Sequence, residues 1–190
     1  MCDDITRISN LCMTIAAHDT VSGGGEGRTA LMLAVQYDGG ARVTMVLHAL
    51  LSAGQDAYVN AQNKRGSTAL MLAAKHGGEH AAKMLEVLLD AGADANKQDR
   101  EGQTALMIAA EYGGEHGAGM MRLLLEHGGH VAANMQDKNG WTALMHAAAE
   151  GGERSAEAMR VLLDAGADAN TQDKDGWTAL MLAAMFGDEY

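Results

Sequence analysis

Histidine is the side chain in this sequence whose spacing could build a metal site. His76 and His80 are four residues apart, which would place two ligands on one face of a continuous helix, but a Gly-Gly pair lies between them and would end such a helix. His127 and His130 have only His116 loosely near them. A zinc site needs about four convergent ligands. We therefore expect no metal site.

The motifs of covalent catalysis and of phosphate binding are also absent from the sequence. No Ser or Cys stands in a nucleophile motif, and the glycine run at 23–25 lacks the Lys and following Ser or Thr of a phosphate-binding loop. The sequence therefore predicts a protein that is not an enzyme and that needs no cofactor.

Composition narrows the range of partners and compartments. Lys plus Arg total 14 against 25 Asp plus Glu, a net charge of −11, which argues against broad binding to a phosphate backbone. Only Cys2 and Cys12 are present, so neither a disulfide framework nor a paired thiolate motif is expected. No apolar run approaches the ~20 residues that span a bilayer, and no secretory signal is evident. We expect a cytoplasmic protein in a reducing compartment, without nucleic-acid or membrane partners.

The elements that must position any binding side chains come from an internal repeat. Within the 190 residues, the string Thr-Ala-Leu recurs at intervals of 39, 36, 38 and 36 residues, each time in the frame G-x-T-A-L-M. The five copies begin at Thr29, Thr68, Thr104, Thr142 and Thr178. Such regular spacing indicates stacked copies of one structural unit.

Each unit reads as two short helices and a turn. In the second copy, Thr68 is a candidate N-cap, and Leu70, Ala73 and Ala74 form one apolar stripe. After the Gly-Gly pair, a second apolar stripe begins at Ala81 and ends near a glycine, and a polar, glycine-punctuated turn follows. Neither helix is long enough to persist alone, so neighbouring units must share a continuous core.

The frame G-x-T-A-L-M-x-A-A, the closing G-A-D-A-N and the Gln-Asp-x-x-Gly finger resemble the ankyrin repeat over about residues 25 to 187. Ala replaces that family's Pro, and Met replaces its His at five positions, where flexible Met packing would replace hydrogen bonds between units. The resemblance implies an all-α solenoid of stacked helix-turn-helix units with turn or hairpin fingers. It also implies that partners bind the concave surface made by the fingers and the first helices.

We expect one repeat domain over 1–190, made of an N-terminal capping helix (4–18) and linker (1–26 together), repeats at 27–65, 66–101, 102–139 and 140–175, and a half repeat at 176–190. The units exceed the family's usual length of about 33 residues, which should extend the second helix. Added residues at 55–60 and 129–134 should form bulging loops. The half repeat leaves apolar surface near Leu180, so an end-to-end contact is a further expectation.

The outward positions of the concave surface hold the candidate partner-binding residues. They are Tyr37, Arg65, His76, Arg100, Gln103, Tyr112, Lys138, Trp141, Lys174, Trp177 and Phe186. Five of the seven aromatic residues of the chain fall in these slots, and Trp and Tyr are common interface anchors. Two alternatives stay open at this stage: the Trp side chains could pack on the adjacent finger, and the cations in the fingers, which recur at Lys64, Arg100, Lys138 and Lys174, could simply be solvated.

His146 replaces a Leu or Ile of the other units, and we expect a hydrogen-bonded core histidine there, not a pH switch. The sequence thus predicts a non-catalytic module that binds another protein of unknown identity. Two alternatives remain: an acidic inhibitor or immunity-type protein that blocks a basic enzyme or mimics nucleic-acid charge, and a structural subunit of a larger assembly.

Overall fold

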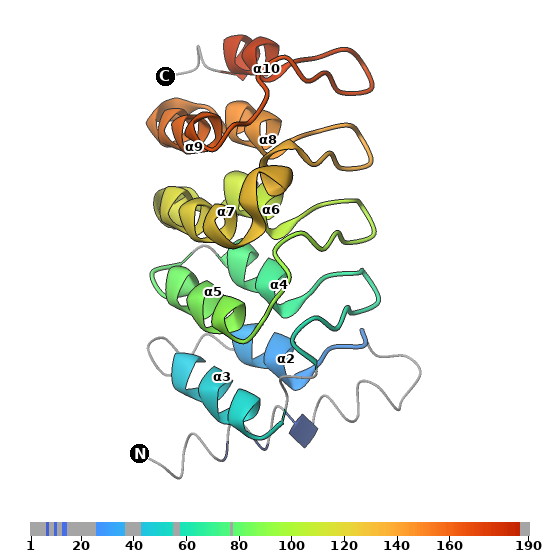
Figure 1. Ribbon diagram of the computed structural model, residues 1–190, viewed down its shortest axis with the longest axis vertical. Coiled ribbons are helices and arrows are strands. Elements are labelled where there is room, and N and C mark those ends of the chain that lie inside the picture. The colour runs from blue at the N-terminus through green and yellow to red at the C-terminus, as the bar shows by residue number, and fades with distance from the viewer. Residues whose placement is uncertain are drawn as a thin grey trace.

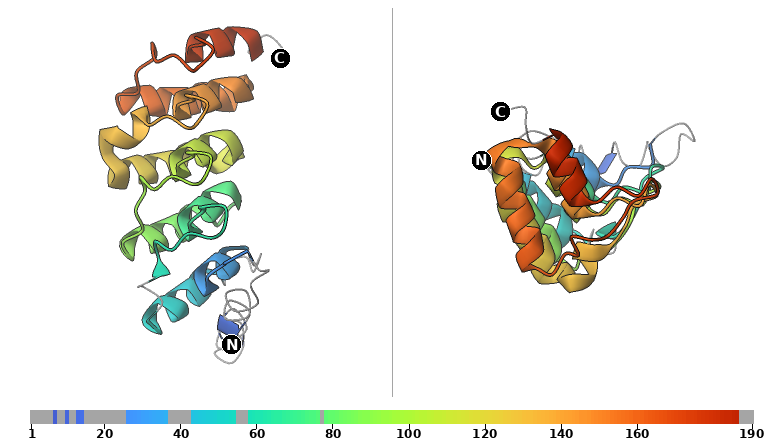
Figure 2. Two further views of the ribbon diagram at one scale, coloured as in Figure 1. Left: turned by 90° about the vertical axis from the view of Figure 1, so that its right-hand side faces the viewer. Right: turned by 90° about the horizontal axis from the view of Figure 1, so that it is seen from above.

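The computed structural model describes residues 26–36, 43–54, 58–76 and 78–186, together with Arg7, Asn10, Met13 and Thr14. These residues form an inner and an outer layer of stacked helices, and a row of turns, the fingers, projects from the side of the inner layer (Figures 1 and 2). The inner layer, next to the fingers, contains α2 (Ala30–Gln36), α4 (Ala69–His76), α6 (Ala105–Tyr112), α8 (Ala143–Glu150) and α10 (Ala179–Phe186). The outer layer contains α3 (Val43–Ser52), α5 (Ala81–Asp90), α7 (Gly117–Asn134) and α9 (Gly152–Asp164), and a 3-10 turn, η3 (Gly114–His116), precedes α7.

The repeated threonine starts the inner helices as the sequence predicts. Thr104 and Thr142 are N-caps in extended conformation, and each side chain accepts a hydrogen bond from the backbone N–H of the Met three residues later. The inner helices are only 7 or 8 residues long, too short to be stable alone. Their stability must therefore come from packing between units.

That packing forms one continuous core. α4 packs against α2 and α6, and α6 packs against α8, while each outer helix covers the inner helix of its own unit. Leu31, Leu70, Leu106 and Leu144 are at most 2% exposed, and Met32, Met71, Met107 and Met145 are equally buried. The expected all-α solenoid is confirmed, and no β-strand occurs among the described residues.

The expected bulging loop at 129–134 is wrong. α7 continues through these residues to Asn134, giving a helix of 18 residues. Ala132 and Ala133 are fully buried, so continuing the helix buries two apolar side chains that a loop would leave in water. By contrast, α5 stops at Asp90 because Gly92 adopts a φ of +85°, which favours glycine.

The second and fourth units have the 36-residue length for which the sequence predicts a longer outer helix, and the outer helix is extended in only the fourth. α9 begins at Gly152, directly after the end of the inner helix, whereas residues 78–80 form a bend and turn before α5. Most of the expected N-terminal helix (4–18), Tyr37 and residues 55–57 of the other expected loop lie outside the described residues.

Candidate partner-binding surface

The fingers are the turns that lead into the inner helices, at residues 62–67, 98–103, 136–141 and 172–177. Lys64, Arg100, Lys138 and Lys174 stand at one position of these fingers, and all four are exposed. The backbone N–H of each donates to a backbone carbonyl one level earlier in the stack, with N···O distances from 2.8 to 3.1 Å. The accepting carbonyls are, in order, those of Glu26, Arg65, Glu101 and Asn139. The four cations therefore stand at successive levels of the stack, and we name them the cationic row.

The acidic residue that precedes each of three of these cations is committed to its own finger. Asp99 Oδ1 accepts hydrogen bonds from the backbone N–H groups of Glu101 and Gln103, both at 2.9 Å. Asp137 and Asp173 make the same pair of bonds in their fingers. These carboxylates replace water as partners of backbone N–H groups, and so they stabilise the turns that carry the cations.

A hollow of 320 Å³, which we name the finger hollow, lies between the fingers and inner helices of the second and third units. It is lined by Lys64, Arg65, Ser67, Met71, Leu72, Lys75, Asp99, Arg100, Glu101, Gln103, Ile108 and Tyr112. Four of the predicted residues meet here: Arg65, Arg100, Gln103 and Tyr112. The hollow contains four cationic and two acidic residues, so its charge is opposite to that of the whole chain.

Tyr112 is an aromatic wall of the finger hollow and is 45% exposed. Lys75 Nζ lies 4.7 Å from the centre of its ring, which is cation–π geometry. A hydrogen bond with Glu111 raises the pKa of Tyr112, with smaller contributions from burial and from the charges of Glu111 and Glu150. The phenol O–H therefore already has an acceptor within the protein, the carboxylate of Glu111, and Tyr112 offers a partner mainly its exposed ring.

Trp141 follows the interpretation in which it packs on the adjacent finger. Its ring is half-buried, and Nε1 donates to Asp173 Oδ2 of the next finger at 2.9 Å. It also contacts His146 in a T-shaped arrangement with ring centroids 5.1 Å apart. The polar atom of Trp141 therefore already has a partner in the adjacent finger.

His146 is buried, as expected for a core histidine, with 7% exposure. Its Nδ1 lies 3.5 Å from Glu111 Oε2 and its Nε2 lies 3.4 Å from Asp137 Oδ2. The expected hydrogen bonding is not found at Nε2, which has no hydrogen-bond partner among the described residues. The histidine therefore lies between two carboxylates and contacts the ring of Trp141.

The other predicted residues that the structure describes lie outside the finger hollow. His76 is exposed at the end of α4, and Lys138 and Lys174 continue the cationic row. Trp177 is 39% exposed in the last finger, and Phe186 is 38% exposed at the end of α10. The structure therefore places one group of predicted residues in a shared hollow and leaves the others spaced along the stack.

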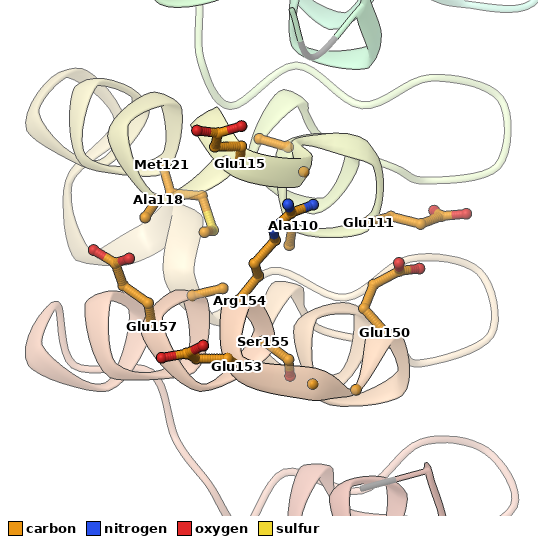
Figure 3. Close-up of a pocket in the computed structure, with 16 residues that line it drawn as sticks. Ala110, Glu111, Glu115, Ala118, Met121, Glu150, Glu153, Arg154, Ser155 and Glu157 are labelled. Atoms are coloured by element: carbon orange, nitrogen blue, oxygen red, sulfur yellow. The ribbon is translucent and has the colours of Figure 1, made fainter. Parts of the chain in front are cut away.

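A second hollow, of 550 Å³, was missed by the sequence reasoning (Figure 3). It lies between the third and fourth units, where inner helices connect to outer ones. Glu111, Glu115, Glu150, Glu153, Glu157 and Arg154 provide its charged side chains. Arg154 extends across it toward Ala110, while Glu111 and Glu150 lie on the finger side (Figure 3).

One position in the repeat could have signalled this acidic hollow. Ala158 occupies the position that is Met84 in the second unit and Met120 in the third, both buried. The shorter side chain leaves space next to Met121.

Burial raises the pKa of Glu150, the nearby Glu111 raises it further, and His146 lowers it, so the two glutamates at the finger side repel each other.

Within the described part of the chain, no cluster of three or more His, Cys, Asp or Glu residues could hold a metal ion. In the same part, no helix has both the length and the apolar character needed to cross a membrane.

The stacked helix pairs and the fingers with their hollow define a class of protein: an all-α repeat scaffold with a row of fingers along one side (Figure 1). The chain matches the family model for ankyrin repeats (3 copies) over residues 8–99, 40–131, 79–173 and 116–190. It therefore belongs to the ankyrin-repeat family. Ankyrin repeats are generally protein–protein interaction modules and are typically not enzymes. No curated protein is significantly similar to the chain.

Proposed function

We propose that this protein is a non-catalytic module that binds another protein through its fingers and inner helices, with the finger hollow at the centre of the contact. The observation that carries the proposal is the meeting of Arg65, Arg100, Gln103 and Tyr112 in one hollow. Arg and Tyr are enriched among residues whose truncation weakens protein complexes most. With only two cysteines the sequence has no disulfide framework, which favours a reducing intracellular compartment as the place of action.

Preorganisation also supports this surface. The fingers are joined by backbone hydrogen bonds, and Arg100 and Lys138 each take part in one. A partner would therefore meet side chains that stand on a fixed backbone, which reduces the conformational entropy lost on binding. A basic-enzyme inhibitor is the weaker alternative, because the finger surface carries cations that would repel a basic partner.

Site-specific photo-crosslinking tests the proposal. Two variants are made, with a photoreactive amino acid in place of either Lys138 in the cationic row or Arg160 on the outer helix α9. Both positions are exposed cations. In a lysate of the cells that naturally make this protein, we expect a protein adduct from position 138 and none from position 160. Adding Tyr112→Ala should remove most of the adduct, since an anchor of this type contributes about 2 kcal/mol or more.

An adduct from position 160 alone, or equal adducts from both positions, would contradict binding through the fingers. Circular dichroism of each variant must match the parent spectrum, because a misfolded variant would lose the adduct for another reason.

A second candidate function, assembly through α10, rests on a different observation. Leu180 is 76% exposed and Met181 is 50% exposed, whereas the counterpart leucines and methionines of the other inner helices are buried. We propose this face as an end-to-end contact with another polypeptide. Light scattering after gel filtration would test self-assembly: Leu180→Glu should lower the mass if copies stack there, while an unchanged monomeric mass would exclude contact between copies.

A further inference from the structure

The finger hollow is opposite in charge to the chain, and an exposed cation recurs in each of the four fingers. The protein has a net charge of −11, yet six of its 14 cationic residues lie in the cationic row or the finger hollow. They are Lys64, Arg65, Lys75, Arg100, Lys138 and Lys174. Such concentration on one surface sets a local potential that net charge does not describe.

Most of the acidic groups near this row are already engaged. Asp99, Asp137 and Asp173 each accept two backbone hydrogen bonds within their own fingers. Asp173 also accepts from Trp141 Nε1, and Glu26 lies 3.6 Å from Arg65. Glu101 and Asp175 are the exposed acids of the fingers, and each stands beside a cation of the row. All of these carboxylates keep their charge, but the three that stabilise the turns are partly buried, so the exposed charged side chains of the four fingers are five cations and two acids.

We propose that the partner presents an extended acidic segment, which lies along the cationic row and places one carboxylate in the finger hollow. This inference rests on the proposed function and adds the chemistry of the partner. Arg65, Lys75 and Arg100 would face that carboxylate, and the Tyr112 side chain lines the same hollow. A guanidinium can hold a carboxylate with two parallel hydrogen bonds, which favours Arg100 as its main partner.

The repeat of the row sets a spacing for the acidic residues. Stacked helices lie about 8–10 Å apart, so successive fingers present a cation at about that interval. An extended chain advances about 3.3 Å per residue, and three residues therefore match one unit. The partner segment should carry Asp or Glu at every third position, and about ten residues should cover the four fingers.

An acidic protein segment explains the surface better than a nucleic acid does. The remaining surface has the same sign of charge as a phosphate backbone, and a nucleic acid would extend beyond the row into that repulsive surface. Single-stranded nucleic acids also use exposed rings for base stacking, whereas the ring of Tyr112 has Lys75 on its face and Trp141 is half-buried.

Fluorescence anisotropy with synthetic peptides tests the proposal on the full chain. The probe is a labelled peptide of about ten residues, matched to the length of the row, with Glu at every third position and Gly and Ser between. Two control peptides have the same composition with contiguous Glu, or Gln in place of Glu. An oligouridine strand is the nucleic-acid control. Binding is measured at about 0.05 M salt and again at about 0.5 M, where screening shortens the reach of charges.

We expect the spaced peptide to bind more tightly than the contiguous peptide, and the Gln peptide and oligouridine to bind weakly. Arg100→Gln with Lys138→Gln should weaken the spaced peptide about fivefold, as for the loss of two partly exposed charge pairs, and high salt should remove the difference. The matched control, Lys83→Gln with Arg160→Gln, removes the same charge from the outer helices and should leave affinity within about twofold.

Three results would overturn the inference: no binding of the spaced peptide, equal weakening by the two double variants, or oligouridine binding as tightly as the peptide. The crosslinking experiment separates this failure from failure of the proposed function. An adduct at position 138 that resists high salt, with no peptide affinity, would retain the binding surface and reject its acidic partner.

Discussion

Gly102→Ala should destabilise the protein much more than Gly176→Ala, although the two glycines occupy the same position of two fingers. Their φ angles are +81° and +83°, a conformation that costs an L-residue about 1–2 kcal/mol. That cost is common to both variants. The difference between them lies in what the new side chain would meet.

A Cβ at position 102 would lie 2.9 Å from the backbone N of Lys138, whereas a Cβ at position 176 would have no atom within 4 Å. The third finger would have to shift, and the hydrogen bond from Lys138 N–H to Glu101 O, at 2.9 Å, would weaken or break. Losing that bond costs about 0.5–1.5 kcal/mol, and the forced shift adds about 1–3 kcal/mol. We expect losses of about 2.5–6.5 kcal/mol for Gly102→Ala and about 1–2 kcal/mol for Gly176→Ala.

Urea unfolding followed by circular dichroism measures the two losses. Whole curves should be compared, because repeat arrays can unfold in more than one step. Losses that agree within about 0.5 kcal/mol, the usual scatter of surface substitutions, would refute the conclusion that close contact between fingers, and not φ alone, requires glycine at position 102.

Three further predictions use the same assay. Leu106→Ala should lower the free energy of unfolding by about 2–5 kcal/mol, while Leu180→Ala, at the same position of α10 but 76% exposed, should change it by less than about 0.5 kcal/mol; similar losses would contradict the assigned burial. Ala158→Met should fill part of the acidic hollow and add about 1–2 kcal/mol, and a loss instead would mean that the space is too narrow for the side chain of the preceding units. Burial and Glu111 raise the pKa of Glu150 above its ordinary 4.5, so the folded state loses stability as the pH rises from 4.5 through the raised pKa. Glu150→Gln should therefore be more stable than the parent near about pH 7 and show no such gain well below pH 4.5, and a pH-independent difference would contradict this assignment.

Local chemistry in the sequence predicted the helices and their buried sides. The threonine caps, the apolar stripes and the ending of α5 before Gly92 each depend on residues within one or two turns. The repeated frame then implied that neighbouring units share a core, because no single unit can cover its apolar side chains. The predicted loop at 129–134 failed because tertiary contacts outweighed local chemistry there. Burial of Ala132 and Ala133 against other elements extended α7 through residues where the local glycines favoured a loop.

The candidate site could be predicted only in part. The sequence located the outward positions of each unit, and it identified the cations and aromatic rings found there. It left two interpretations of Trp141, and only the tertiary structure shows the indole hydrogen bond to Asp173, 32 residues away in the next finger, which supports packing on that finger. Which predicted residues share a hollow also depended on how two units meet.

The sequence by itself determined the repeat, the starts of the inner helices and the row of cations, because each follows from spacing along one chain segment. Tertiary structure alone decided where space remains between units. The finger hollow and the acidic hollow are volumes left by side chains from different units, as where Ala158 and Met121 line the same space. Such volumes depend on close packing between distant residues, and no pattern within a single unit contains that information.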